Sequence, residues 1–211
     1  MKTRVSFLLT IAACFMLAFS SIAGATPALQ ISSGALIVNP LGANYVNPNF
    51  NGWNINLSGQ SDPFYGLALN ATILNPTNDY YSPLEIKFSD TGFLTHGPLQ
   101  SLVSSISGSI PWNQSIQYEA YYGNTLFTQA NLVSNDKISD MIFSAYHELI
   151  LNLPDGYALT QVITLGHWFP SGNEPYLFDA RLGDPPIPEP SSLILLGSGL
   201  LGAAMFVRRK K

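Results

Sequence analysis

The chain has 211 residues, enough for one domain or two small ones, and a formal net charge of −4. Residues 26–187 hold three cations and twelve acids, so this part alone carries −9. That charge makes nucleic acid and anionic lipid poor partners and leaves divalent cations, neutral glycans and other proteins open. Cys14 is the single cysteine, so a chain that loses its N-terminus has no disulfide and no thiolate metal site.

The N-terminus has the organisation of a secretory signal peptide. Lys2 and Arg4 precede an apolar run over residues 5–19, and the small residues Ala23 and Ala25 follow it. We predict export through the Sec machinery and cleavage after Ala25, which makes residues 1–25 a signal peptide with a short signal helix. The apolar run is shorter than the roughly 20 residues that a membrane-spanning helix needs. Lipidation of the cysteine is disfavoured, because the apolar run continues beyond it.

Residues 26–184 are rich in Asn, Ser, Gly, Tyr and Leu, a composition that favours short strands joined by turns. Turn signals such as Asn-Pro and Gly-Asn recur between the apolar segments. Strands at a spacing of roughly 8–12 residues predict an all-β, β-sandwich-like domain. The expected strands cover residues 29–38, 53–58, 65–74, 84–88, 102–110, 116–122, 126–133, 147–153, 157–165 and 176–182.

Three local features refine this prediction. Residues 149–163 form the clearest expected hairpin, in which Pro154, Asp155 and Gly156 supply the turn. The segment just before it is ambiguous, because its apolar residues also recur at helical spacing. A short helix over residues 140–148 therefore stays open as an alternative to a strand. Residues 39–53 are rich in Asn, Gly and Pro and are expected to form a loop.

The sequence contains little that indicates catalysis. His96, His147 and His167 are far apart, and no metal-binding H-x-x-x-H, nucleophile G-x-S-x-G or phosphate-binding motif occurs. His147 and Glu148 would point to opposite faces of a strand and could not act together. We therefore expect no enzyme, no cofactor and no metal site that can be named. A polysaccharide hydrolase stays open, because glycosidase carboxylates can be distant in sequence. A structural Ca²⁺ in the acidic loops stays open as well.

Aromatic residues offer a way to bind sugars, because their ring faces can stack against the apolar faces of a sugar ring. The candidates for such stacking are Trp53, Trp112, Trp168, Tyr121 and Tyr122. The alternative for each tryptophan is a place in the sandwich core. Of two adjacent tyrosines in a strand, one ring must face outward. A glycan-binding module predicts a shallow groove floored by two or three of these rings.

The C-terminal segment, residues 185–211, combines a polar motif, an apolar stretch and four cations. Residues 191–207 carry no charge and would rise about 25 Å as a helix, so we predict a transmembrane helix there. Pro188 and Pro190 cannot continue a helix, so Glu189 between them is expected in extended chain at the outer membrane boundary. The terminal cations would stay on the cytoplasmic side; they are Arg208, Arg209, Lys210 and Lys211.

The motif Pro188-Glu189-Pro190-Ser191-Ser192, the apolar helix and the basic end together resemble the PEP-CTERM sorting domain of Gram-negative bacteria. The same segment is sometimes labelled the "ice-binding protein C-terminal domain", a label that is no evidence for ice binding. The resemblance implies that an exosortase processes a precursor anchored in the inner membrane, which then reaches the cell surface or extracellular matrix. Proteins with this tail are typically associated with exopolysaccharide and biofilm.

The expected organisation is a signal peptide (1–25), a secreted β-rich domain (26–184) and a sorting tail (185–211). The body resembles no family, so the resemblance covers the tail alone. The expected role is non-enzymatic, either structural or associated with exopolysaccharide. An extracellular carbohydrate-binding module is the first alternative, and a polysaccharide hydrolase is the second.

Overall fold

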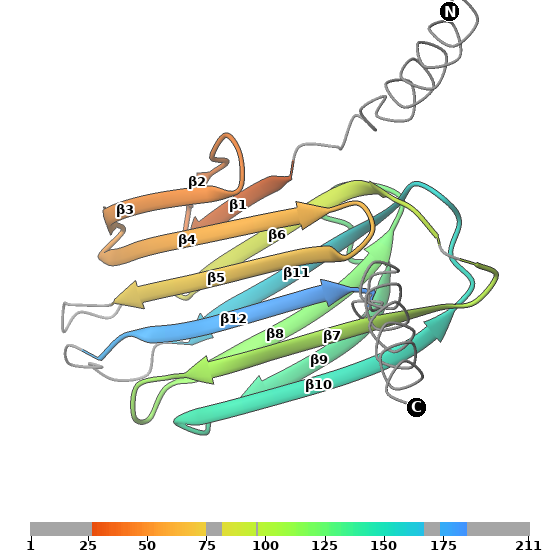
Figure 1. Ribbon diagram of the computed structural model, residues 1–211. Coiled ribbons are helices and arrows are strands. Elements are labelled where there is room, and N and C mark those ends of the chain that lie inside the picture. Colours follow the sequence, from red (N-terminus) through yellow and green to blue (C-terminus); the bar gives the residue numbers. More distant parts are fainter. Residues whose placement is uncertain (1–26, 75–81, 96, 167–173, 185–211) are drawn as a thin grey trace, which may run out of the picture.

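The computed structural model describes residues 27–74, 82–95, 97–166 and 174–184, which form a sandwich of two six-stranded sheets (Figure 1). All neighbouring strands are antiparallel, and these described residues contain no helix, so the all-β prediction is confirmed. Sheet A has, in spatial order, β2 (Leu36–Val38), β1 (Ala28–Ser33), β6 (Leu84–Phe93), β11 (Tyr157–Gly166), β8 (Ser115–Gly123) and β9 (Asn131–Ile138). Sheet B has β10 (Ile142–Leu151), β7 (Gln100–Ser109), β12 (Tyr176–Gly183), β5 (Gly66–Leu74), β4 (Trp53–Asp62) and β3 (Asn44–Phe50).

The strands form because apolar residues alternate with polar ones, which gives each sheet one face for the core. In β4, Trp53, Ile55 and Leu57 are buried, while Asn56 and Ser58 between and after them are exposed. This period of two matches the alternation of side chains across a strand. Each fully buried Ile or Leu side chain contributes about 1.5–3 kcal/mol of hydrophobic stabilisation. The core therefore lies between the sheets, and the outer face of β4 is left polar.

The helix that the sequence left open over residues 140–148 is wrong. Residues Ile142–Leu151 form β10, and every residue of this strand pairs with β7. Ile142, Tyr146 and Ile150 lie on the outer face and are exposed, whereas Phe143 and Ala145 pack against the core. The apolar spacing fitted a helix only because outward-facing and inward-facing strand residues were counted together. Pairing with a distant strand decided the structure.

The predicted hairpin over residues 149–163 is also wrong, although its turn is present. β10 belongs to sheet B and β11 to sheet A, so the connection crosses from one sheet to the other. Gly156 has φ +81°, as the turn chemistry predicted. The carboxylate of Asp155 accepts hydrogen bonds from the Thr95 backbone N–H (3.0 Å) and hydroxyl (2.6 Å). The turn therefore fixes a corner of the sandwich to the chain that leaves β6.

Two further segments differ from the expectation. The predicted loop over residues 39–53 contains the edge strand β3, whose pairing with β4 shifts register between Asn47 and Phe50. Pro48 lies in this shift, where the missing N–H removes no ladder bond. The strand expected over residues 126–133 begins only at Asn131.

The predicted signal peptide and the predicted transmembrane helix over residues 191–207 lie outside the described residues. Within the described part of the chain, no helix is long and apolar enough to cross a membrane. The boundaries of the predicted secreted domain, residues 26–184, stay a prediction.

Candidate functional site

The outer face of sheet B carries two adjoining hollows, one of about 410 Å³ and one of about 760 Å³. On each of four neighbouring strands, a residue that lines the first hollow is two positions away from a residue that lines the second. These pairs are Ser58 and Gln60 on β4, Asn70 and Ala68 on β5, Asp179 and Arg181 on β12, and Ser107 and Ser105 on β7. Residues two apart in a strand share a face. The hollows therefore form one continuous surface, which we call the sheet B groove.

The smaller hollow is lined mainly by neutral polar side chains that can both donate and accept hydrogen bonds. Asn56, Asn70 and Thr72 contribute amides and a hydroxyl from β4 and β5, and Ser107 contributes a hydroxyl from β7. All four are exposed on the outer face. Asp179 of β12 also lines this part of the groove, so neutral polar groups lie beside one carboxylate there.

The charges in the groove are paired or held in turns. Arg181 Nε donates to Asp179 Oδ1 over 3.0 Å on the outer face of β12. This hydrogen bond and the carboxylate charge raise the pKa of the Arg181 guanidinium. The carboxylate of Asp62 accepts hydrogen bonds from the backbone N–H groups of Phe64 and Tyr65 (2.8 and 3.1 Å), which organises the β4–β5 turn. Among the described residues that line the groove, the carboxylates of Asp62, Asp179 and Asp184 outnumber the Arg181 guanidinium, so the groove is mildly acidic.

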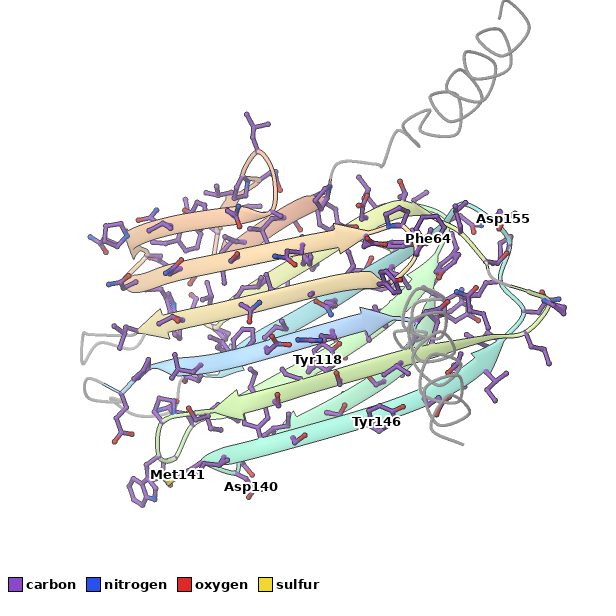
Figure 2. All side chains as sticks on the ribbon, viewed as in Figure 1. Phe64, Tyr118, Asp140, Met141, Tyr146 and Asp155 are labelled. Carbon is purple, nitrogen blue, oxygen red and sulfur yellow. The ribbon has the colours of Figure 1, made fainter. Side chains whose placement is uncertain are left out.

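Two exposed tyrosines, neither of them expected from the sequence, line the larger hollow. Tyr146 projects from β10 (Figure 2), and 61% of its surface is exposed. Tyr65 lies on the β4–β5 turn with 46% of its surface exposed. Their rings are the aromatic surfaces that the groove offers to a ligand. The period-two pattern of Ile142, Ser144 and Tyr146 would have placed Tyr146 outward if the segment had been interpreted as a strand.

The aromatic residues predicted to stack against sugars do not lie together. Trp53 is 0% exposed and belongs to the core, so its predicted role in stacking is wrong. Trp112 is 69% exposed on the loop between β7 and β8. Tyr122 packs partly against the core, and Tyr121 is half-buried near the opposite end of β8 from Trp112. Trp168 lies outside the described residues. The structure therefore separates the predicted candidates instead of forming one groove from them.

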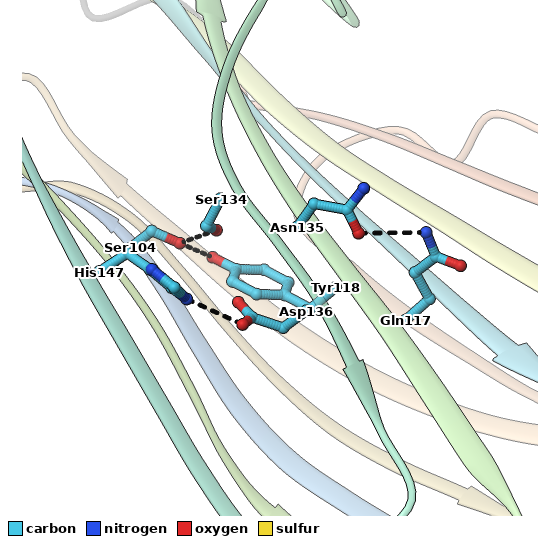
Figure 3. Close-up of polar contacts among 7 residues, drawn as sticks. All are labelled: Ser104, Gln117, Tyr118, Ser134, Asn135, Asp136 and His147. Atoms are coloured by element: carbon cyan, nitrogen blue, oxygen red, sulfur yellow. Dashed lines mark hydrogen bonds and ion pairs between the residues drawn. The ribbon is translucent and has the colours of Figure 1, made fainter.

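A buried polar network lies beneath the groove (Figure 3). Ser104 on β7 donates to the hydroxyl of Tyr118 on β8 (3.2 Å), and Tyr118 donates to the backbone carbonyl of Arg181 (3.0 Å). Ser104 also bonds with Ser134 on β9 over 2.7 Å. Burial raises the pKa of Tyr118 well above its usual range, so its hydroxyl stays protonated and available as a donor. A side chain of sheet A thus binds the β12 backbone at Arg181, whose guanidinium lines the groove.

Ser104, His147 and Asp136 lie close together, but they are not arranged for nucleophilic catalysis. His147 Nε2 bonds with Asp136 Oδ1 over 2.8 Å, which connects the edge strands β10 and β9 (Figure 3). Ser104 pairs with His147 in the β7–β10 register, yet no hydrogen bond joins their side chains among the described residues. Ser104 is wholly buried, whereas a nucleophile needs a base as partner and access to substrate. The contact between His147 and Asp136 therefore joins the two sheets at one edge of the sandwich.

The remaining expectations about sites have the following outcomes. Glu148 bonds with Ser101 on the outer face while His147 points inward, so their predicted separation is confirmed. Among the described residues, no group of three or more His, Cys, Asp or Glu side chains could hold a metal ion. His96 and His167 lie outside the described part of the chain. So do the predicted cleavage residues Ala23 and Ala25, the sorting motif and the basic end.

Residues 186–210 match the family model of the PEP-CTERM protein-sorting motif, which confirms the sorting tail predicted from the sequence. The motif indicates an exosortase-sorted surface protein of a Gram-negative bacterium that is anchored transiently in a membrane. No curated protein sequence matches the chain.

Three solved structures are similar to the chain at low scores. TmCBM61 in complex with β-1,4-galactotriose has 12% identity and a TM-score of 0.34, and the match covers 67% of this chain and 99% of that one. CBM35 from Paenibacillus barcinonensis has 8% identity and a TM-score of 0.28, covering 68% and 100%. The CBM22-1 xylan-binding domain of Xyn10C from the same organism has 8% identity and a TM-score of 0.28, covering 65% and 85%.

Proposed function

We propose that this protein is a non-enzymatic component of the cell surface or extracellular matrix that binds a neutral polysaccharide in the sheet B groove. The observation that carries the proposal is the continuity of the two hollows across β4, β5, β12 and β7. A continuous open groove accommodates a chain, whereas a closed pocket would select a small molecule. The sorting tail supports the proposal, because it directs the domain to the place where extracellular polysaccharide is found.

The chemistry of the groove favours sugar. Amide and hydroxyl side chains such as Asn56, Asn70 and Ser107 match the hydroxyl groups of a hexose, each of which donates and accepts hydrogen bonds. Tyr146 and Tyr65 supply exposed ring faces for the apolar face of a sugar ring. The formal charge of −9 on residues 26–187 would repel an acidic glycan, so a neutral chain is the better ligand.

The carboxylates around the groove favour binding over hydrolysis. A glycosidase needs two carboxyl groups flanking the scissile bond, one of which donates a proton. Of the carboxylates that line the groove, Asp179 is paired with Arg181, Asp62 accepts from two backbone N–H groups and Asp184 accepts from the side-chain amide of Gln100. Asp90 has a pKa raised by burial, but this side chain is 3% exposed and does not line the groove.

The test uses the exported chain in lipid nanodiscs that hold one copy each. The probe is the protease-treated neutral exopolysaccharide of the producing bacterium, with alginate as an acidic comparison. Stacking of this kind is worth about 0.5–1.5 kcal/mol, so Tyr146→Ala should weaken binding by about two- to thirteenfold. Tyr121→Ala, which removes a half-buried tyrosine of sheet A, is the matched control and should leave binding unchanged. Absence of binding by the unmodified chain, or equal effects of both variants, would overturn the proposal.

A further inference from the structure

A third hollow, of about 590 Å³, lies at the tip of the sandwich and shares no lining residue with the groove. It is formed by the β7–β8 and β9–β10 loops, which a backbone hydrogen bond from Ile110 to Met141 (2.9 Å) holds together. Trp112 is the largest side chain that lines it, and 69% of its surface is exposed. We call this hollow the tip site.

The turn that carries Trp112 is rigid and holds the indole out of the core. Asn113 has φ +59°, a conformation that Asn tolerates better than most residues. The backbone N–H of Gln114 donates to the carbonyl of Pro111 (3.2 Å), and its side-chain oxygen accepts from the buried hydroxyl of Tyr176 (3.1 Å). Both Pro111 and Gln114 are buried. An exposed tryptophan on an anchored turn forgoes the hydrophobic stabilisation of burial, which points to a role in binding.

The other side chains of the tip site are polar and balanced in charge. Lys137 and Asp140 contribute one charge of each sign, and Asn113 and Ser139 contribute neutral hydrogen-bonding groups. An indole face beside amide and hydroxyl groups is suited to a sugar ring, as in the groove. A partner protein that buried the indole would need a wider apolar surface, whereas Met141 is the one other large apolar side chain that lines this hollow.

The tip site and the larger hollow of the groove lie at opposite ends of the sandwich. Figure 2 shows Asp140 and Met141 at one end and Phe64, which adjoins Tyr65 in the β4–β5 turn, at the other. β7 lines the larger hollow at Val103 and Ser105 and ends at Ser109, so about 13–20 Å of strand separates that hollow from the end of β7 that precedes Trp112. Two polysaccharide segments can therefore bind at these places without overlapping.

We propose that the tip site is a second binding site for neutral polysaccharide, so that one copy of the protein bridges two polysaccharide chains. The inference depends on the proposed function of the groove for its ligand class, but it is carried by separate residues. A protein with two sites would cross-link the extracellular matrix, whereas a protein with one site would only attach to it. Binding at both sites at once also strengthens overall binding to a dense matrix, because binding at one site raises the effective concentration of polysaccharide at the other.

The test compares two readouts on single-copy nanodiscs of the exported chain. Beads coated with the host's protease-treated neutral exopolysaccharide report bridging by agglutination, and the bound protein per bead reports binding. Trp112→Ala should lower agglutination at least tenfold while the affinity for soluble exopolysaccharide in the groove changes less than twofold. Tyr146→Ala should also lower agglutination, and the double variant should lose most binding. Tyr121→Ala should behave like the unmodified chain.

The outcomes separate this inference from the proposed function. If Trp112→Ala agglutinates beads as the unmodified chain does, while Tyr146→Ala weakens binding, the groove is a binding site and the tip site is not. If Trp112→Ala alone abolishes binding, the tip is the single site and the proposal for the groove is wrong. The third outcome is that each substitution weakens the same binding event and that one polysaccharide chain binds per protein in every variant. The groove and the tip would then be parts of one long site, and bridging would be refuted.

Discussion

Replacement of Tyr118 by phenylalanine would test the polar network that joins the two sheets beneath the groove. The substitution removes one oxygen from a wholly buried position and keeps the ring, so it creates almost no cavity. Three hydrogen bonds disappear: those accepted from Ser104 (3.2 Å) and from the Gln161 amide (3.5 Å), and the one donated to the Arg181 carbonyl (3.0 Å).

The loss of stability depends on which hydrogen bonds the former partners of Tyr118 keep. Ser104 keeps its bond with Ser134 (2.7 Å), so its hydroxyl stays satisfied. The Arg181 carbonyl loses the donor that reaches it from sheet A, and each lost hydrogen bond is worth about 0.5–1.5 kcal/mol. We expect Tyr118→Phe to lower the free energy of unfolding by about 1–2 kcal/mol. That is a large fraction of the roughly 5–15 kcal/mol that stabilises an ordinary domain.

Denaturant titration followed by the fluorescence of the buried Trp53 would measure this loss. Tyr45→Phe is the matched control, because the Tyr45 hydroxyl accepts from Asn47 (2.9 Å) in a half-buried place on β3 where water can replace the bond. The control should cost less than about 0.5 kcal/mol. Equal costs for the two variants, or a cost for Tyr118→Phe no larger than that of the control, would refute the reasoning.

Further predictions concern pH, the backbone and sorting. Stability should fall as pH rises above ~10, because unfolded tyrosines ionise there while buried ones stay neutral; each contributes up to about 1.4 kcal/mol per pH unit. The tyrosines whose pKa is raised by burial are Tyr118, Tyr157 and Tyr176. Thermal melting at pH 9 and 11 would measure this loss of stability, and equal melting temperatures would contradict the prediction. Gly66→Ala should destabilise the fold by over ~2 kcal/mol, since φ is +96° and a Cβ would lie 2.2 Å from a β12 carbonyl oxygen. Gly42→Ala, with φ +88° and open space, should cost less in the same denaturant titration, and the reverse order would count against the steric argument. Glu189→Ala in the host should leave unprocessed precursor in the inner membrane on immunoblots of cell fractions, and normal processing would exclude a role for this motif.

Local patterns in the sequence predicted the strands but could not assign them to sheets. Alternating polar and apolar residues predict a strand wherever one face is buried, as in β4, because the period of two is a property of the local chain. The crossover at Pro154-Asp155-Gly156 has the same turn chemistry as a hairpin. Whether β10 pairs with β11 or with β7 depends on residues about 40 positions earlier in the chain.

The candidate site was harder to predict than the fold. The number of aromatic residues indicated that some rings would be exposed, but the sequence did not show which face of a sheet each ring occupies. Trp53 begins a strand and points inward, whereas Trp112 is held outward by a turn whose geometry depends on Asn113. Tyr146 was missed because its segment was ambiguous between helix and strand. The sorting tail was predictable because its recognition depends on a short contiguous motif.

The strand order has a consequence for when the domain can fold. β12 is the last strand of the described residues, yet it lies in the middle of sheet B, between β5 and β7. Until it arrives, the β3–β4–β5 and β7–β10 parts of that sheet share no hydrogen-bonded neighbour, and such long-range pairing is slow. β12 ends at Gly183, and the sorting motif begins at residue 186. The strand that completes sheet B and the sorting motif are therefore separated by two residues of chain.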